Sequence, residues 1–254
     1  MSISEKNKLE WEGKICTSNN AGDFKILEYK DTNHVLIEFL QTGYKKEASF
    51  SNVKKGAVDD PYYPSVYGIG YFGDGPYTSR DNKGPQKKVY KVWKEMIGRC
   101  YCKEISSYKA YGERGVTVCK DWLNYQNYAK WYEENCPNEE WAVDKDILHK
   151  GNKEYSPENC CFVPTEINDC FTKRLSERGD YPIGVRKKGN SIIAQINYMG
   201  KKKHLGSFKT VKEAFEAYKK AKEQCIKEYA EKYKEQITDE VYNALLNYKV
   251  EITD

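Results

Sequence analysis

The segment WAVDKDILHKGNKEYSPENCCFVPTEIN, residues 141–168, decides the fold of the middle of this chain. Two short segments, 141–145 and 160–163, have the length of strands, and a Gly-Asn pair marks a turn in the loop between them. Pro164 follows the second of these, and proline is favoured in the first turn of a helix. The segment therefore predicts a strand, a crossing loop, a second strand and a helix that carries Asn168.

This order of elements resembles the HNH (ββα-metal) endonucleases, with a likeness to phage homing endonucleases. In that family an acidic residue and a later Asn or His bind one divalent cation. The resemblance implies that Asp144 and Asn168 are the metal ligands and that Asn159 ties the loop to the strand. Oxygen ligands of this kind favour Mg or Mn, and the cation would stabilise the leaving oxygen of a cleaved phosphodiester.

Lys145 stands where the resemblance implies a catalytic His beside the acid. A lysine with an unperturbed pKa of about 10.4 is protonated at neutral pH and cannot act as a general base. We therefore expect cleavage to be weakened or lost, with the ammonium neutralising Asp144 or contacting a DNA phosphate. His149 is the alternative base in the loop. The alternative for the whole segment is a structural loop in which Asp144 pairs with Lys145 or Arg174.

The region before this segment predicts two helices. Apolar residues recur at steps of three and four over 89–100, and aromatic residues share one face over 122–132, with Asp121 as the expected N-cap. A Trp-x-x-Met-x-x-Arg-Cys motif in the first helix and a Tyr-Gly-x-Arg-Gly turn after it resemble the segment that precedes the nuclease motif in phage HNH proteins. This resemblance covers residues 89–171.

The C-terminal region predicts a small sheet followed by a helix. Three runs of strand length, 183–187, 191–198 and 203–208, are separated by Gly-Asn and Gly-Lys turns. Thr210 and Glu213 then have the spacing of a capping box at the start of an amphipathic helix.

The motifs of this region are similar to the ethylene-response-factor (ERF) type of DNA-binding domain. They are Gly184-Val-Arg186, Leu205-Gly-Ser-Phe208 and Glu213-Ala-Phe-Glu-Ala-Tyr218. In that family the sheet lies in the major groove of double-stranded DNA, whose width fits a β-ribbon. The resemblance makes Arg186 a DNA-contacting residue. Charge and strand alternation add Lys188, Gln195 and Lys203 as candidates.

The N-terminal region alternates apolar and polar residues over 24–29 and 34–39, around an Asp-Thr-Asn turn. This pattern predicts a small β-barrel of four to five strands. The whole chain is therefore expected to be α+β and multidomain. The expected parts are a small β-barrel at 1–75, a degenerate HNH-like domain at 86–176, an ERF-type domain at 179–236 and a tail helix at 237–254 that Thr238 caps.

Composition limits the class of protein. The 254 residues are 39% hydrophobic, carry a formal net charge of +4 and contain no apolar run long enough for a membrane helix. The absence of a signal peptide favours the cytoplasm, which is the host cytoplasm for a phage-encoded protein. Nine cysteines without a Cys-x-x-Cys pair predict reduced, mostly buried thiols and no structural zinc.

Three functions remain open on the sequence. The first is a phage-type DNA-binding protein of HNH ancestry whose cleavage is weakened or lost. The second is an active Mg- or Mn-dependent nickase or homing endonuclease. The third is a non-catalytic protein that binds a host protein or another anion, as anti-host-defence proteins do, with no membrane partner.

Overall fold

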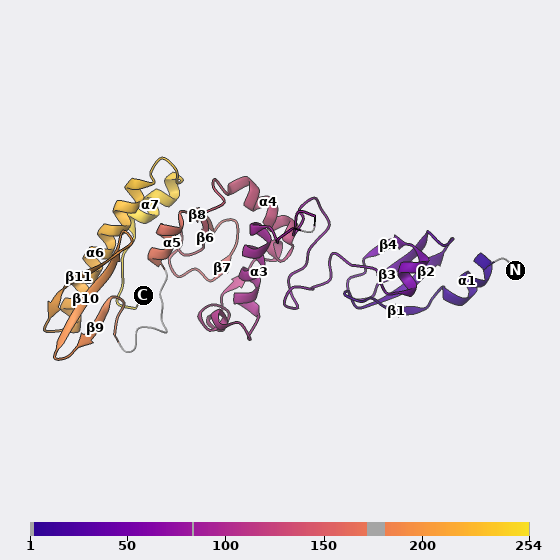
Figure 1. Cartoon of the computed structure of the whole chain (residues 1–254), viewed down its shortest axis with the longest axis horizontal. Helices are drawn as coiled ribbons and strands as arrows, with labels where there is room; N and C mark the ends of the chain where they lie inside the picture. Colours follow the sequence, from indigo (N-terminus) through magenta and orange to yellow (C-terminus); the bar gives the residue numbers. More distant parts are fainter. Residues whose placement is uncertain (1–2, 83, 172–180, 254) are drawn as a thin grey trace. The chain divides into compact units, whose positions relative to one another are not determined.

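The computed structural model describes residues 3–82, 84–171 and 181–253 and shows a mixed α/β protein with several sheets (Figure 1). It forms two compact units, Met1–Glu134 and Asn135–Asp254. Their boundary lies inside the expected HNH-like segment 86–176. None of the helices in the described ranges combines the length and apolarity needed to cross a membrane.

The N-terminal part of the first unit is an antiparallel four-stranded sheet with the strands in chain order. Alternate residues of the second and third strands, including Phe24, Ile26, Ile37 and Phe39, are fully buried, which confirms both expected strands. No ladder joins the first strand to the last within the described ranges, so these residues form an open meander rather than the expected barrel. The elements are α1 (Ile3–Trp11), β1 (Ile15–Thr17), β2 (Asp23–Tyr29), β3 (Val35–Phe39), β4 (Lys45–Ala48) and α2 (Phe50–Lys54).

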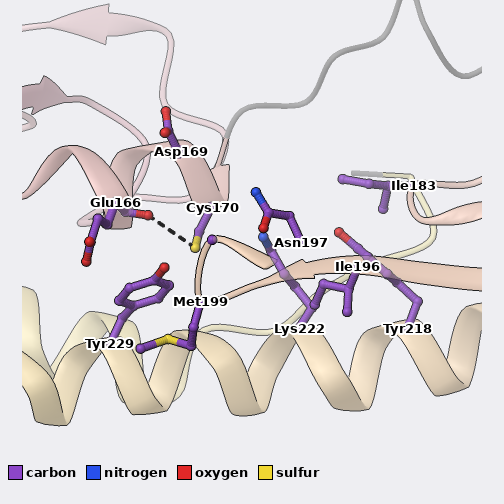
Figure 2. Close-up of a pocket in the computed structure, with 11 residues that line it drawn as sticks. Glu166, Asp169, Cys170, Ile183, Ile196, Asn197, Met199, Tyr218, Lys222 and Tyr229 are labelled. Atoms are coloured by element: carbon purple, nitrogen blue, oxygen red, sulfur yellow. Dashed lines mark hydrogen bonds between the residues drawn. The ribbon is translucent and has the colours of Figure 1, made fainter. Parts of the chain in front are cut away.

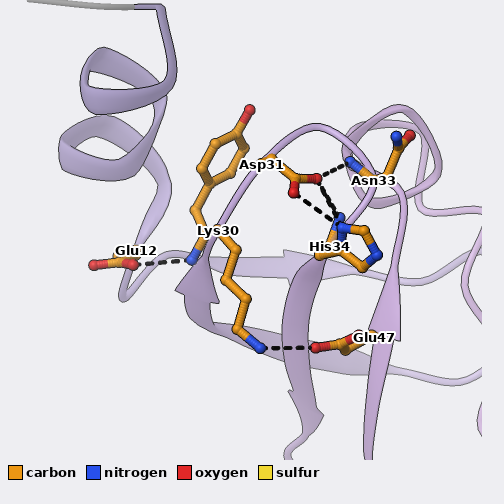
Figure 3. A network of polar contacts seen from close by, with 7 residues as sticks. Glu12, Lys30, Asp31, Asn33, His34 and Glu47 are labelled. Atoms are coloured by element: carbon orange, nitrogen blue, oxygen red, sulfur yellow. Dashed lines mark hydrogen bonds and ion pairs between the residues drawn. The ribbon is translucent and has the colours of Figure 1, made fainter.

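Figure 3 shows the polar contacts that close the β2–β3 turn. Asp31 accepts hydrogen bonds from the backbone N–H groups of Asn33 at 2.7 Å and His34 at 3.0 Å, as an Asp side chain does in a tight turn. Lys30 pairs with Glu47 of β4 at 3.0 Å. The expected Asp-Thr-Asn turn is confirmed. These exposed contacts stabilise the turn and the adjacent strands.

Two helices and short 3₁₀ turns complete the first unit. The first expected helix is confirmed, and its Trp93 donates a hydrogen bond from Nε1 to the carbonyl of Trp122 at 2.7 Å. Asp121 lies inside a 3₁₀ turn, so its prediction as N-cap is wrong. Instead Asn124 Oδ1 accepts from the N–H of Gln126 at 3.0 Å. The elements are α3 (Lys88–Tyr101), η1 (Ser106–Ala110), η2 (Gly112–Arg114), β5 (Thr117–Val118), η3 (Lys120–Leu123) and α4 (Tyr125–Asn135).

The second unit begins with two short antiparallel strands and a helix, in the order expected from the sequence. Asp144 at the end of the first strand pairs with Cys161 at the start of the second. The helix begins directly after Pro164, whose carbonyl accepts the N–H groups of Ile167 and Asn168. The elements are β6 (Ala142–Asp144), β7 (Glu154–Tyr155), β8 (Cys161–Val163) and α5 (Thr165–Phe171).

The rest of the second unit is a three-stranded antiparallel sheet packed against a long helix. The sheet order is β11-β10-β9. The predicted capping box is confirmed, because Thr210 accepts from Glu213 N–H and the Glu213 side chain accepts from Thr210 N–H. Thr238 caps the last helix as expected. The elements are β9 (Val185–Lys188), β10 (Ser191–Tyr198), β11 (Lys201–Phe208), α6 (Val211–Lys232) and α7 (Asp239–Asn247).

All nine cysteines are free thiols, as expected. Cys100, Cys160, Cys161 and Cys225 are buried and the other five are half-buried, so the expectation that most are buried is wrong. The difference arises because several of these residues lie in short turns and at helix ends, where a side chain is covered on one side only.

Candidate functional site

Asp144 ends β6, and α5, the helix that carries Asn168, packs against β6. One carboxylate oxygen of Asp144, Oδ1, accepts two backbone hydrogen bonds, from Asp146 at 2.7 Å and Ile147 at 2.8 Å. Because an Asp side chain commonly closes a turn in this way, Asp144 shapes the loop after the strand. Oδ2 is the oxygen that remains to bind a ligand.

Burial raises the pKa of the Asp144 carboxyl, and the two backbone N–H donors act in the opposite direction without reversing the shift. Lys145 lowers this pKa only as a minor contribution, after the repulsive effect of Asp146. The carboxylate is therefore held in surroundings that disfavour its charge.

Asp144→Asn is expected to stabilise the protein at neutral pH, because an amide oxygen keeps both backbone hydrogen bonds and carries no charge. The folded pKa is raised, so the acid contributes stability below its ordinary pKa, and this stability is lost as pH rises through the folded value. Urea denaturation from acidic to neutral pH should show that loss in the natural protein and a flatter profile in the variant. Equal slopes in the two proteins would contradict the buried-carboxylate account.

Lys145 is buried and bound within the loop rather than directed to solvent. Its Nζ donates to Asp146 Oδ1 at 2.8 Å and to the carbonyl of Asn152 at 2.7 Å. The amide of Asn152 returns a hydrogen bond to the carbonyl of Lys145 at 3.0 Å. The ammonium therefore pairs with Asp146, not with Asp144, and it closes the loop between β6 and β7.

The other predicted site residues lie apart from this ion pair. His149 is exposed, and its carbonyl accepts from the N–H of Asn152 at 3.0 Å. Asn159 lies just before β8, where its backbone N–H donates to Ser156 at 3.2 Å. Asn168 is half-buried on α5. Arg174, the alternative partner of Asp144, lies outside the described residues.

The described side chains near Asp144 offer few ligands to a divalent cation. Three or more His, Cys, Asp and Glu side chains do not meet at any point of the described ranges. Asp144 offers one oxygen beyond its turn bonds, and the nearest carboxylate in sequence, Asp146, is engaged by Lys145. Mg²⁺ requires near-octahedral oxygen coordination. The described side chains alone do not complete that shell, which Mg²⁺ commonly fills with water.

The register of the strands decides which residues of the C-terminal sheet lie on each of its two faces. Ser191, Ile193, Gln195 and Asn197 alternate along one face of β10, and residues paired across the strands share that face. Seven of the residues on this face have exposed polar or charged side chains, whereas Gln195 is half-buried and Ile193 is buried. The exposed seven are Arg186, Lys188, Ser191, Asn197, Lys202, His204 and Ser207.

Lys203 belongs to the opposite face, the one that packs against α6. It pairs with the buried Ile196, and its ammonium lies 5.0 Å from the ring centroid of Tyr198. Tyr198 donates a hydrogen bond to Glu228 of α6 at 2.6 Å. The structure thus brings Arg186, Lys188 and Gln195 together but not Lys203.

Sequence reasoning did not name Lys202 and His204 as DNA-contact candidates, although both lie in the basic stretch 182–204. The β10–β11 turn contains Met199 and Gly200 with φ of 47° and 76°, and it sets the register that pairs Lys202 with Asn197. A register shift between Ala194 and Gln195 then pairs Gln195 with His204. The turn was recognisable from its glycine, whereas the irregularity has no sequence signal of its own.

No family model, curated protein or solved structure matches this chain.

Proposed function

We propose that this is a phage-type, DNA-binding protein of HNH endonuclease ancestry in which cleavage is weakened or lost. The observation that carries the proposal is the exposed face of the C-terminal sheet, where Arg186, Lys188, Lys202 and His204 gather around Gln195. Acidic residues are absent from β9, β10 and β11, so the local field is positive.

A sheet face of this kind suits duplex DNA. A short antiparallel ribbon fits the major groove, lysines bind phosphates, and Arg and Gln side chains offer the donors that read base edges. Arg186 lies opposite Ile193 on the central strand, and Gln195 lies opposite His204, so both side chains lie between the outer lysines. The face thus combines groups that position a duplex with groups that discriminate sequence.

Loss of cleavage is supported by the contacts of Lys145, which stands where the resemblance implies the catalytic His. Lys145 is held by Asp146 and Asn152, so its ammonium is not poised to take a proton from water. His149 is exposed and has no contact with Asp144 among the hydrogen bonds of the described chain. DNA binding therefore does not require that the ββα segment be active.

DNA titration of the full chain, followed by fluorescence anisotropy at several salt concentrations, tests the proposal. We expect log affinity to fall linearly with log salt, and Lys188→Ala to reduce the slope by about 0.9, as one lost phosphate contact does. Arg186→Ala should weaken binding about tenfold or more. Lys203→Ala is the matched control: it also removes an exposed lysine, but from the face toward α6, and should change affinity less than twofold.

Supercoiled plasmid with magnesium or manganese separates binding from cleavage. We expect no nicking by the natural protein. Nicking that Asp144→Ala abolishes would overturn the proposed loss of activity and leave an active nickase. If duplex DNA does not bind at low salt, the DNA-binding proposal fails and the protein-interaction function remains.

A further inference from the structure

A cavity of about 280 Å³ lies between α5, α6 and the β10–β11 hairpin (Figure 2). This volume is smaller than that of most sites for drug-sized ligands, so the cavity suits a smaller molecule. Ile183, Ile196 and Met199 give it apolar walls, and polar side chains of α5 and α6 line the rest. The cavity therefore combines apolar surface with groups that can bind a polar ligand.

Lys222 is the buried cation of this cavity. Its side chain leaves α6 toward the cavity (Figure 2), and the residue is only 9% exposed. Within the described ranges, no hydrogen bond or ion pair joins its ammonium to another residue. A buried ammonium is costly without an anionic partner. Lys222 therefore offers an unpaired positive charge to an anion that enters the cavity.

The hydroxyl of Tyr229 is a second donor without an acceptor. Tyr229 is 5% exposed, and its hydroxyl makes no hydrogen bond to any residue that the structure describes. It lies seven residues after Lys222, about two helical turns, and so on the same face of α6. Figure 2 shows its ring directed from α6 toward α5. Two donors therefore face the cavity from one helix.

The other polar groups that line the cavity do not satisfy these donors. Glu166 is paired with Lys232 at 2.6 Å, and the thiol of Cys170 donates to the carbonyl of Glu166 at 3.4 Å. Asp169 is exposed, and the described part of the chain contains no ion pair between it and Lys222. Because Glu166 and Asp169 are both exposed acids, they disfavour a ligand that carries more than one negative charge.

We propose that this cavity binds a small organic monocarboxylate, which accepts hydrogen bonds from Lys222 and Tyr229 and packs its carbon atoms against the apolar walls. An ammonium binds a carboxylate through charge-assisted hydrogen bonds, and burial strengthens them because little water competes. Phosphate carries more than one negative charge near neutral pH and has no apolar part, so it fits this cavity less well. This inference goes beyond the proposed DNA binding and does not depend on it.

Thermal unfolding of the full chain with added acetate, butyrate or benzoate tests the proposal. A ligand that binds only the folded protein raises the melting temperature, and the dependence on concentration gives the dissociation constant. Each carboxylate is compared with its neutral amide, acetamide, butyramide or benzamide, which has a similar shape and no charge. We expect the tightest carboxylate to bind about tenfold or more tightly than its amide, and more tightly than inorganic phosphate at equal ionic strength.

Lys222→Met removes the ammonium and keeps most of the aliphatic volume. It should weaken binding of the tightest carboxylate about tenfold or more, and Tyr229→Phe should weaken it about fivefold. Without ligand, folded Lys222→Met should melt at a higher temperature than the natural protein, because the unpaired buried charge is gone. Lys227→Met is the matched control: Lys227 is exposed on the same helix, and its substitution should leave the dissociation constant unchanged.

Several results would overturn the proposal. One is that none of the three carboxylates raises the melting temperature, and another is that the amides bind as tightly as the acids. Unchanged affinity in folded Lys222→Met would also overturn it, as would inorganic phosphate binding more tightly than every carboxylate. If circular dichroism shows that Lys222→Met does not fold, Tyr229→Phe, which removes a single oxygen, decides by the same measurement.

Discussion

Gly184→Ala is expected to lower the free energy of unfolding by about 3 kcal/mol or more. Gly184 has φ of +76°, a conformation that L side chains rarely adopt, and an added Cβ would lie 2.0 Å from a ring carbon of Tyr218. Tyr218 is buried on the face of α6 that covers the sheet, so displacing its ring disturbs the packing of the helix on the sheet. The substitution should therefore separate the sheet from its helix.

Gly189→Ala is the matched control for this prediction. Gly189 also has a positive φ, +60°, but no heavy atom lies within 4 Å of the added Cβ. Gly189→Ala should lower the free energy of unfolding by about 1 kcal/mol, through backbone strain alone. Chemical denaturation of both variants isolates the clash as the difference between them. Similar losses at the two glycines would show that the sheet and α6 can move apart without penalty, which contradicts the packing described here.

Local chemistry was sufficient to predict several element boundaries. Thr210 and Thr238 each begin a helix because their hydroxyls accept hydrogen bonds from backbone N–H groups three residues later. This interaction depends only on residues close together in the sequence, so the sequence predicts it. The start of α4 was missed for the opposite reason. Tyr71 bonds to Leu123 and Tyr125 through its backbone N–H and carbonyl, and this contact from a distant segment places the helix start after a 3₁₀ turn.

At the candidate site, too, the sequence predicted the local elements but not the contacts between segments that are distant in the chain. The order of Asp144, Cys161 and Asn168 on strand, strand and helix was predictable from segments of strand length and a proline. The partner of Lys145 was not, because it depends on how the loop folds back to bring Asn152 beside the ammonium. Lys203 was misplaced among the DNA-facing candidates for a similar reason: strand alternation gives two faces, and the register decides which one meets α6.

Lys145→Met is expected to cost about 2 to 3 kcal/mol of stability. The Lys145 side chain is 6% exposed and donates to Asp146 and to the carbonyl of Asn152, so methionine would retain the aliphatic volume and leave both acceptors without their donor. Asp146 is 40% exposed, and solvent therefore offsets part of the loss on that side. Urea denaturation of the purified chain measures the difference.

Lys130→Met provides the same substitution at an exposed ion pair. Lys130 and Glu134 lie 3.9 Å apart with side chains 66% and 60% exposed, and pairs of this kind contribute about 0.5 kcal/mol or less. A large loss at Lys145 beside a small loss at Lys130 would establish that the lysine holds the loop that positions Asp144. Equal, small losses would remove that structural reason for a lysine at this position. The ammonium would then have to act on DNA or on the Asp144 carboxylate, and a DNA titration of Lys145→Met would decide between those two roles, because only the first predicts weaker binding.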